Sequence, residues 1–170
     1  LLDLDLENYA IGGLAVGEPK NEMLQTTEWM NNLIPREKSR YLMGVGTPID
    51  IIECVKRGID MFDCVIPTRN ARNSQLFTYD GTINIRNACY KNDHSLIDAQ
   101  SKSPLSQKYT KAYLHHLFKM NEILGLRIST SHNLNFYIEL MKIIQIKITE
   151  NCFEAWSNDF INRYNKKNNE

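Results

Sequence analysis

The feature that most constrains the fold is an alternation of short apolar runs with segments of helical periodicity between residues 9 and 66. Strands that alternate with helices at this spacing are typical of parallel sheets joined by right-handed crossovers. The sequence therefore predicts an α/β fold. Three strands and two helices are expected, in the order Tyr9–Val16, Asn21–Leu33, Tyr41–Val45, a helix that Thr47 and Pro48 begin and Gly58 ends, and Met61–Ile66.

Glycines or polar residues follow each of the three expected strands. Gly13, Gly44 and the segment after Asp63 lie where the carboxyl ends of parallel strands meet. Active groups in barrels of this class lie at those ends. The adjacent glycines Gly12 and Gly13 let the backbone approach a ligand closely, or they form a bulge, and both interpretations stay open.

Asp63 is a carboxylate inside the apolar run Met61–Ile66, which we expect to be a strand buried on both faces. A buried ionised carboxylate is costly unless it is paired or functional, so Asp63 is either a structural residue that accepts backbone N–H groups or a reactive one. Asp60 is expected on the opposite face of the strand and is interpreted as structural. Pro67 ends the run, and a short loop with two arginines is expected after it.

The second half of the chain changes pattern. A hairpin is expected over residues 75–86, with Asp80 and Gly81 forming a type I′ turn. Residues 92–106 are polar and are expected to be irregular. Three amphipathic helices are predicted after them: Gln107–Leu124, which Gly125 ends, then about residues 132–150, then a final helix that contains Phe153, Trp156, Phe160 and Ile161.

Composition indicates a globular protein of 170 residues with 20 basic and 20 acidic side chains, hence no net charge. This balance argues against a general polyanion binder but leaves room for RNA on a local basic patch. No apolar run is long enough to cross a membrane and no signal peptide is present, so we expect no membrane partner and a cytoplasmic location. The four cysteines are scattered and form no metal or redox motif.

Long unusual strings then identify a resemblance. The segments Gly58–Arg72, Tyr9–Glu18 and Tyr41–Pro48, supported by Ala112–Leu117, resemble the bacterial tRNA-guanine transglycosylases of queuosine synthesis, also called tRNA-ribosyltransferases. The resemblance runs through nearly the whole chain and corresponds to the C-terminal portion of the family. It implies the C-terminal half of a (β/α)8 TIM-type barrel with an inserted hairpin over residues 1–90, followed by a helical subdomain over residues 91–170.

The resemblance also implies a chemistry. The family exchanges guanine at the tRNA wobble position for a 7-deazaguanine precursor, and Asp63 matches the nucleophile that forms a covalent bond to ribose. Gly13, Leu14 and Met43 match positions that contact the base, and Glu18 lies close to them in the sequence. The expected partners are the tRNA anticodon loop, the 7-deazaguanine base and a second copy of the full-length protein.

Two segments match the family's contacts to the anticodon loop, and the arginines among them can bind phosphate or stack on bases. The expected RNA-binding residues are Gly44, Val45, Gly46, Thr47, Pro48, Ile49, Asp50, Thr68, Arg69, Asn70, Ala71 and Arg72.

The sequence departs from the family at its zinc site, where three cysteines and a histidine are the rule. Ser101, Ser103 and Ser106 occupy the cysteine positions, and His132 matches the histidine. Neutral hydroxyls are poor zinc ligands, so the zinc site is expected to be lost and no cofactor is expected. The other histidines, at positions 94, 115 and 116, do not rebuild a ligand set at a recognisable spacing.

Two hypotheses from different classes follow. In the first, the chain is a portion of a transglycosylase that keeps its nucleophile and is inactive alone, because the acid/base partner belongs to the N-terminal half of the family. In the second, it is a non-catalytic RNA-binding or dimerisation partner, or a decayed remnant. Asp63 and the arginines Arg69 and Arg72 favour the first hypothesis, and the three serines favour the second.

Overall fold

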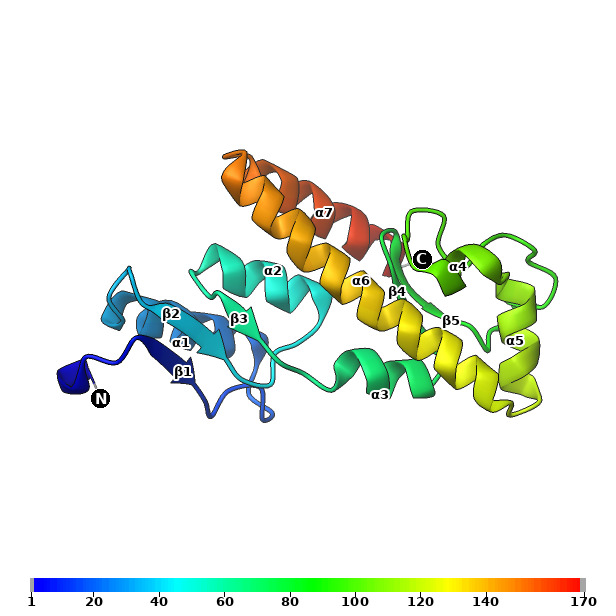
Figure 1. Cartoon of the computed structure of the whole chain (residues 1–170), viewed down its shortest axis with the longest axis horizontal. Coiled ribbons are helices and arrows are strands. Elements are labelled where there is room, and N and C mark those ends of the chain that lie inside the picture. The colour runs from blue at the N-terminus through cyan, green and yellow to red at the C-terminus, as the bar shows by residue number, and fades with distance from the viewer. Residues whose placement is uncertain (1, 169–170) are drawn as a thin grey trace. The chain divides into compact units, whose positions relative to one another are not determined.

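The structure is a computed structural model that describes residues 2–168. The chain divides into two compact units, Leu1–Ile66 and Pro67–Glu170 (Figure 1). Each unit is described by itself below. The division expected at residue 90 concerns the family's architecture and stays a prediction.

The first unit is built on a parallel sheet with the strand order β1-β2-β3. Its elements are β1 (Asn8–Ile11), α1 (Lys20–Leu33), β2 (Ser39–Leu42), α2 (Pro48–Lys56) and β3 (Met61–Phe62), after a short turn η1 (Leu2–Leu4). The predicted alternation of parallel strands and helices is confirmed. Tyr9, Ile11 and Leu42 are buried in the core that the strands share with α1 and α2.

The termini of α2 follow from local sequence. Thr47 is the N-cap, Pro48 lies in the first turn, and Asp50 completes a capping box because its carboxylate accepts from the Thr47 backbone N–H at 3.1 Å. Gly58, just after the helix, has φ of 86°, and a Cβ there would lie 2.4 Å from Oδ1 of Asn31. Both reasons require glycine at this end of the helix.

The third strand differs from the prediction. It is two residues long, and Met61 and Val65 are 45% and 62% exposed, so the expected strand Met61–Ile66 buried on both faces is wrong. β3 is an edge strand, paired on the described chain only with β2, and its outward residues lack a covering layer. The arginine segment is a helix, α3 (Ile66–Arg72), and not a loop, because the fixed φ of Pro67 suits the first turn of a helix.

In the second unit, α3 is followed by the predicted hairpin, formed by β4 (Gln75–Thr78) and β5 (Gly81–Asn84). The predicted turn is wrong by one residue. Thr78 pairs with Gly81, so the two loop residues are Tyr79 and Asp80, and the positive φ of 130° is at Gly81, the first residue of β5. A type I′ turn needs positive φ at both central residues, which neither a tyrosine nor this register provides.

Helices cover the hairpin. They are α4 (Pro104–Lys108), α5 (Lys111–Lys119), α6 (Ile123–Thr149) and α7 (Phe153–Asn168), preceded by the short turn η2 (Ala88–Tyr90). The predicted continuous helix Gln107–Leu124 is wrong, because α4 ends at Lys108 and Asn121, with φ of 56°, separates α5 from α6. The next helix was predicted to start near residue 132, but α6 already begins at Ile123. Gly125 lies inside α6, where a Cβ would approach Cβ of Leu117 to 3.1 Å, so this glycine allows α5 and α6 to pack closely.

The long helix α6 organises the core of the second unit, with β4 and α7 both packed against it (Figure 1). Phe77 of β4 meets Phe136 and Tyr137 of α6, with ring centroids 6.3 and 5.3 Å apart. The segment 92–106, predicted to be polar and irregular, contains the start of α4, and its Asp98 is buried and accepts from the backbone N–H groups of Tyr79 and Gln100. Among the described helices, none is long and apolar enough to span a membrane.

Candidate functional site

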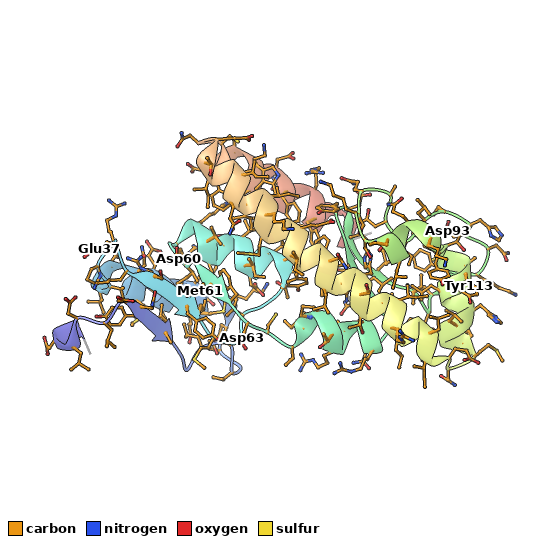
Figure 2. All side chains as sticks on the ribbon, in the orientation of Figure 1. Glu37, Asp60, Met61, Asp63, Asp93 and Tyr113 are labelled. Carbon is orange, nitrogen blue, oxygen red and sulfur yellow. The ribbon has the colours of Figure 1, made fainter. Side chains whose placement is uncertain are left out.

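Asp63 lies just beyond the carboxyl end of β3 (Figure 2). In parallel α/β barrels, active groups lie at this end of the strands. Its Oδ1 atom accepts two hydrogen bonds, from the Tyr41 hydroxyl at 2.6 Å and from the Gly44 backbone N–H at 3.0 Å. Both donors come from the neighbouring strand β2 and the turn after it. The side chain is exposed, so the carboxylate is held in place and remains accessible.

Both hydrogen bonds favour the ionised form of Asp63. The Tyr41 hydroxyl is the larger cause and the Gly44 N–H the second, and together they lower the pKa of the carboxyl below its ordinary value. The same contact raises the pKa of Tyr41, so the phenol remains a donor. At neutral pH the arrangement presents an oriented carboxylate and not a carboxylic acid.

Asp60 has a different environment. Its carboxylate accepts from the Arg40 backbone N–H at 2.8 Å, and its own N–H donates to the Arg40 carbonyl at 3.0 Å. Arg40 in turn donates through its guanidinium to carbonyls at the end of α1, including that of Ile34 at 2.8 Å. Asp60 therefore closes a structural network, as the sequence predicted.

The predicted base-contacting residues lie in the turns after β1 and β2. Met43 is joined to β1 by its N–H, which donates to the Ile11 carbonyl at 3.0 Å, and its side chain is 45% exposed, so it is not a core methionine. Gly13 adopts φ of 77° and is exposed. Leu14, in contrast, packs partly against the core of the first unit.

Glu18 shapes the first of these turns. Its carboxylate accepts from the backbone N–H groups of Ala15 and Val16, the second at 3.0 Å. The bond from Ala15 is the largest cause that lowers the pKa of Glu18, so this side chain is an anion that fixes the loop after Gly13.

Of the predicted RNA-binding residues just before α2 and in its first turn, only some are available to a ligand. Val45, Gly46 and Pro48 are buried, and Gly44 is exposed and already donates to Asp63. Thr47 and Ile49 are half-buried. Asp50 is occupied by the capping box and by an ion pair with Lys20 at 2.7 Å.

On α3, Arg69 and Arg72 are exposed, whereas Ala71 is fully buried. Asn70 turns to Gln75, to whose Oε1 atom its amide donates at 2.6 Å, and Thr68 is half-buried. The two arginines are therefore the residues of this segment that can reach a phosphate.

Ser101, Ser103, Ser106 and His132, the four positions that the resemblance predicts to correspond to zinc ligands, are all buried in the second unit. The Ser106 hydroxyl lies 2.7 Å from Nδ1 of His132, and Nε2 of His132 lies 2.8 Å from the Phe77 carbonyl oxygen. Because a carbonyl only accepts, Nε2 carries the proton, and Nδ1 accepts from Ser106. The Ser101 hydroxyl accepts from the Ser103 backbone N–H at 3.2 Å.

These residues do not fit a zinc ion. The lone pair of His132 that would bind a metal already accepts a hydrogen bond, and the other three side chains are neutral hydroxyls. Burial lowers the pKa of His132, which keeps the ring neutral. In the part of the chain that the structure describes, no group of three histidine, cysteine or acidic side chains could hold a metal ion.

Sequence reasoning missed two residues that organise these sites. Tyr41, near the end of β2 and three residues before Gly44, belongs to the motif Tyr41–Pro48, but the motif does not reveal that its hydroxyl donates to Asp63. Asn133, on α6, donates to the carbonyls of Pro67 and Gln75 and accepts from the Phe77 N–H, so it ties α3 and β4 to the long helix. A buried asparagine beside His132 was the available signal.

Comparison with known proteins gives a consistent result. A family model described as queuine tRNA-ribosyltransferase matches residues 1–166. The chain is 52% identical over 167 residues to a queuine tRNA-ribosyltransferase of Haemophilus ducreyi, covering 98% of this chain and 44% of that protein. It is 51% identical to that of Pasteurella multocida (98% and 43%) and 49% identical to that of Francisella tularensis (96% and 45%). The chain thus spans less than half the length of these relatives.

Proposed function

Because this chain belongs to the queuine tRNA-ribosyltransferase family, we propose that it is a portion of an enzyme that exchanges guanine at the tRNA wobble position for a 7-deazaguanine precursor. The observation that carries the proposal is the oriented, ionised and exposed carboxylate of Asp63. Asp60 differs because its carboxylate accepts from the backbone N–H of Arg40, whose guanidinium is itself bonded to carbonyls at the end of α1.

In the proposed mechanism Asp63 is the nucleophile. Tyr41 and Gly44 both bind Oδ1, so we assign Oδ2 to the bond with ribose. Attack on the anomeric carbon forms the C–O bond while the glycosidic C–N bond breaks, and guanine leaves with that electron pair and a proton from a general acid. The incoming base then gives up a proton, attacks the same carbon and releases the carboxylate. Retaining glycosidases use a carboxylate in the same way.

The general acid and base are placed outside these 170 residues. Asp60 is committed to Arg40, and Glu18 is committed to the loop after Gly13. Loss of general acid–base catalysis alone costs typically 10²–10⁴-fold, and loss of substrate positioning costs more. We therefore propose that the chain does not turn over without the rest of the enzyme.

Substrate contacts are assigned to exposed groups near Asp63 and on α3. Gly13, Leu14 and Met43 are proposed to contact the base, which the exposure of Met43 supports. The exposed arginines Arg69 and Arg72 are proposed to bind anticodon-loop phosphates. The other residues of the two matching segments are proposed to contact RNA through their backbone or to hold these groups in place.

The test measures incorporation of labelled guanine into a cognate tRNA, with and without a separately supplied N-terminal portion of a relative. With that portion present, Asp63→Ala is expected to lower exchange by about 10⁴-fold or more, because the covalent route is removed. Glu37→Ala, at an exposed carboxylate of the same unit, serves as the matched control and should keep full activity. Retained exchange in Asp63→Ala would contradict the nucleophile, and exchange by the 170-residue chain alone would contradict its dependence on a second part.

The second candidate is a non-catalytic RNA-binding or dimerisation partner, or a decayed remnant. It is favoured by the serines that match the family's cysteines, since the second unit has departed from the family there. The same assay separates the two: a complex that binds tRNA tightly but shows no exchange, whether or not Asp63 is present, would favour this candidate.

Two architectural proposals accompany the function. The parallel order β1-β2-β3 with intervening helices supports the C-terminal half of a (β/α)8 barrel. The Ser106–His132–Phe77 hydrogen bonds support loss of the family's zinc. Metal analysis of the purified chain is expected to find far less than one equivalent of zinc, and a tightly held equivalent would overturn this proposal. A homodimer of the full-length protein and a cytoplasmic location remain predictions.

A further inference from the structure

A cavity of about 470 Å³ in the second unit is not used by the proposed chemistry. It lies between the segment after η2 and one face of α5, and its lining residues are Lys91, Asn92, Ala112, His115, His116 and Lys119. The four residues from α5 follow the helical spacing i, i+3, i+4 and i+7, so they form a single stripe. In Figure 2, Asp93 and Tyr113 mark the two elements that form its walls.

The walls of the cavity are fixed by hydrogen bonds. The Ala112 N–H donates to the Asp93 carbonyl at 2.7 Å, and the Lys111 N–H donates to the Ser95 carbonyl at 3.0 Å, which binds the segment to the start of α5. Nδ1 of His115 lies 2.8 Å from the Ile85 carbonyl oxygen, so this buried ring is anchored to the end of the hairpin. A site held in this way requires little ordering when a ligand binds.

The lining is cationic and polar. Lys91 comes from one wall and Lys119 from the other, both side chains are exposed, and no carboxylate lines the cavity. The nearest acid along the chain, Asp93, is compensated by Lys111 at 3.5 Å and by the Ser95 hydroxyl at 2.6 Å. Two lysines on facing walls without an acidic neighbour between them attract an anion.

We propose that this cavity binds phosphates of the tRNA backbone, at a place that shares no residue with the segments matched to the anticodon loop. The inference rests on the proposed function, which supplies an RNA substrate. The lining contains no phenylalanine, tyrosine or tryptophan, and the His115 ring is buried and bonded to the Ile85 carbonyl, so we expect the site to bind the backbone without reading sequence.

An acidic protein partner fits the same charges less well. The energetic centre of a protein interface is formed by large apolar or aromatic side chains in desolvated pockets. The only apolar residue of this lining is Ala112, and it is buried. A sugar–phosphate backbone needs charge and hydrogen-bond donors, which the lysines and Asn92 provide.

The experiment measures binding of fluorescent tRNA to the 170-residue chain over a series of salt concentrations. The test variant is Lys91→Gln with Lys119→Gln, and the matched control is Lys142→Gln, at an exposed lysine of α6. The double variant is expected to raise Kd about tenfold and to reduce the slope of log K against log salt by about one per lysine, equally for cognate and non-cognate tRNA. The control should behave as the wild type.

Each outcome decides the inference. Unchanged affinity and slope in the double variant would overturn it while leaving guanine exchange, and hence the proposed function, untouched. A wild-type chain that binds no RNA would also overturn it, and exchange in the complemented assay would then show whether the function survives. A polyglutamate peptide provides the competing outcome. If it displaces tRNA from the wild type but not from the double variant, and binds the wild type as tightly as tRNA does, the site belongs to an acidic protein partner and the inference is overturned.

Discussion

Asp63 in the first unit and His132 in the second are each held by two hydrogen bonds, but at opposite degrees of burial. Asp63 is exposed and accepts from Tyr41 and Gly44, whereas His132 has no exposed surface and bonds to Ser106 and Phe77. At the exposed residue, hydrogen bonds favour the charged form, which the proposed chemistry requires. At the buried residue, desolvation selects the neutral form and outweighs the opposing effect of the hydrogen bond to Phe77, and a neutral ring suits a structural role.

This difference shows how the two units tolerate change. A carboxylate in solvent stays ionised after a partner is lost, so the first site can be altered with little effect on folding. A buried imidazole has no solvent to replace a lost partner, so a change there is felt by the whole second unit. A change at Asp63 and a change at Ser106 or His132 therefore place different demands on the fold.

The largest expected effect is on stability at the buried residue. His132→Ala removes a ring and leaves the Phe77 carbonyl without its donor, so the free energy of unfolding should fall by about 2–4 kcal/mol. Urea denaturation followed by circular dichroism measures the loss. His94→Ala, at an exposed histidine of the same unit, is the control and should change stability by less than about 0.5 kcal/mol. Equal losses in both variants would contradict the contrast.

The second prediction concerns pH. The pKa of His132 is lowered in the folded state from 6.5, so the unfolded chain binds the proton more readily. The contribution of the neutral ring is complete above pH 6.5, and stability falls as the pH drops below that value, by at most about 1.4 kcal/mol per pH unit. For Asp63, also with a lowered pKa, the corresponding loss lies below pH 3.8.

Denaturation between pH 7 and pH 5 therefore separates the two residues. His132→Gln should remove the His132 part of the loss in this window, while Asp63→Asn should leave it unchanged. A pH profile that is identical in the wild type and His132→Gln would show that the buried ring does not titrate on unfolding in this range.

A pair of serine variants gives a smaller effect with opposite expectations. Ser106→Ala removes the donor to Nδ1 of His132 and should cost about 1–2 kcal/mol. Ser103 is equally buried, but its hydroxyl has no hydrogen-bond partner among the described residues, so Ser103→Ala should be neutral or slightly stabilising. Thermal melts of both variants test the pair. A larger loss of stability in Ser103→Ala than in Ser106→Ala would contradict the assignment of the hydrogen bond to Ser106.

Local sequence predicted the features that local interactions decide. The cap at Thr47, the ending at Gly58 and the order of strands and helices depend on neighbouring residues, and the structure confirms them. The two-residue β3 depends on its pairing with β2. The break at Asn121 is local, since this residue adopts φ of 56° and its N–H donates to the Phe118 carbonyl, but the helical periodicity of the segment hides it. The sequence predicts that Gly125 ends a helix, but Gly125 lies inside α6. Its role is to allow close approach to Leu117 of α5, and local periodicity does not reveal a contact between two helices.

The candidate site shows the same limit. Asp63 could be selected from its place in an apolar run and from the family motif, but its donor Tyr41 is 22 residues away and reaches it only through strand pairing. Likewise, serine at position 106 predicted that His132 is not a zinc ligand, yet the carbonyl that holds its other nitrogen belongs to Phe77, 55 residues away. Hydrogen-bond partners that lie far apart in the sequence could be identified only from the structure.

The smallest expected effect on stability is at Tyr41, and it sharpens the comparison from the exposed side. Tyr41→Phe keeps the ring but removes the hydroxyl that donates to Asp63 at 2.6 Å. Since the carboxylate is exposed, water replaces the lost donor and the free energy of unfolding should change by less than about 0.5 kcal/mol. The pKa of Asp63 should nevertheless rise toward its ordinary value, because the largest cause of its lowering is gone. Carboxyl-carbon NMR titration measures the pKa, with Tyr113→Phe as the control. A Tyr41→Phe variant that loses much of its free energy of unfolding, or one whose Asp63 keeps the wild-type pKa, would contradict the contrast between a solvated carboxylate and a buried ring.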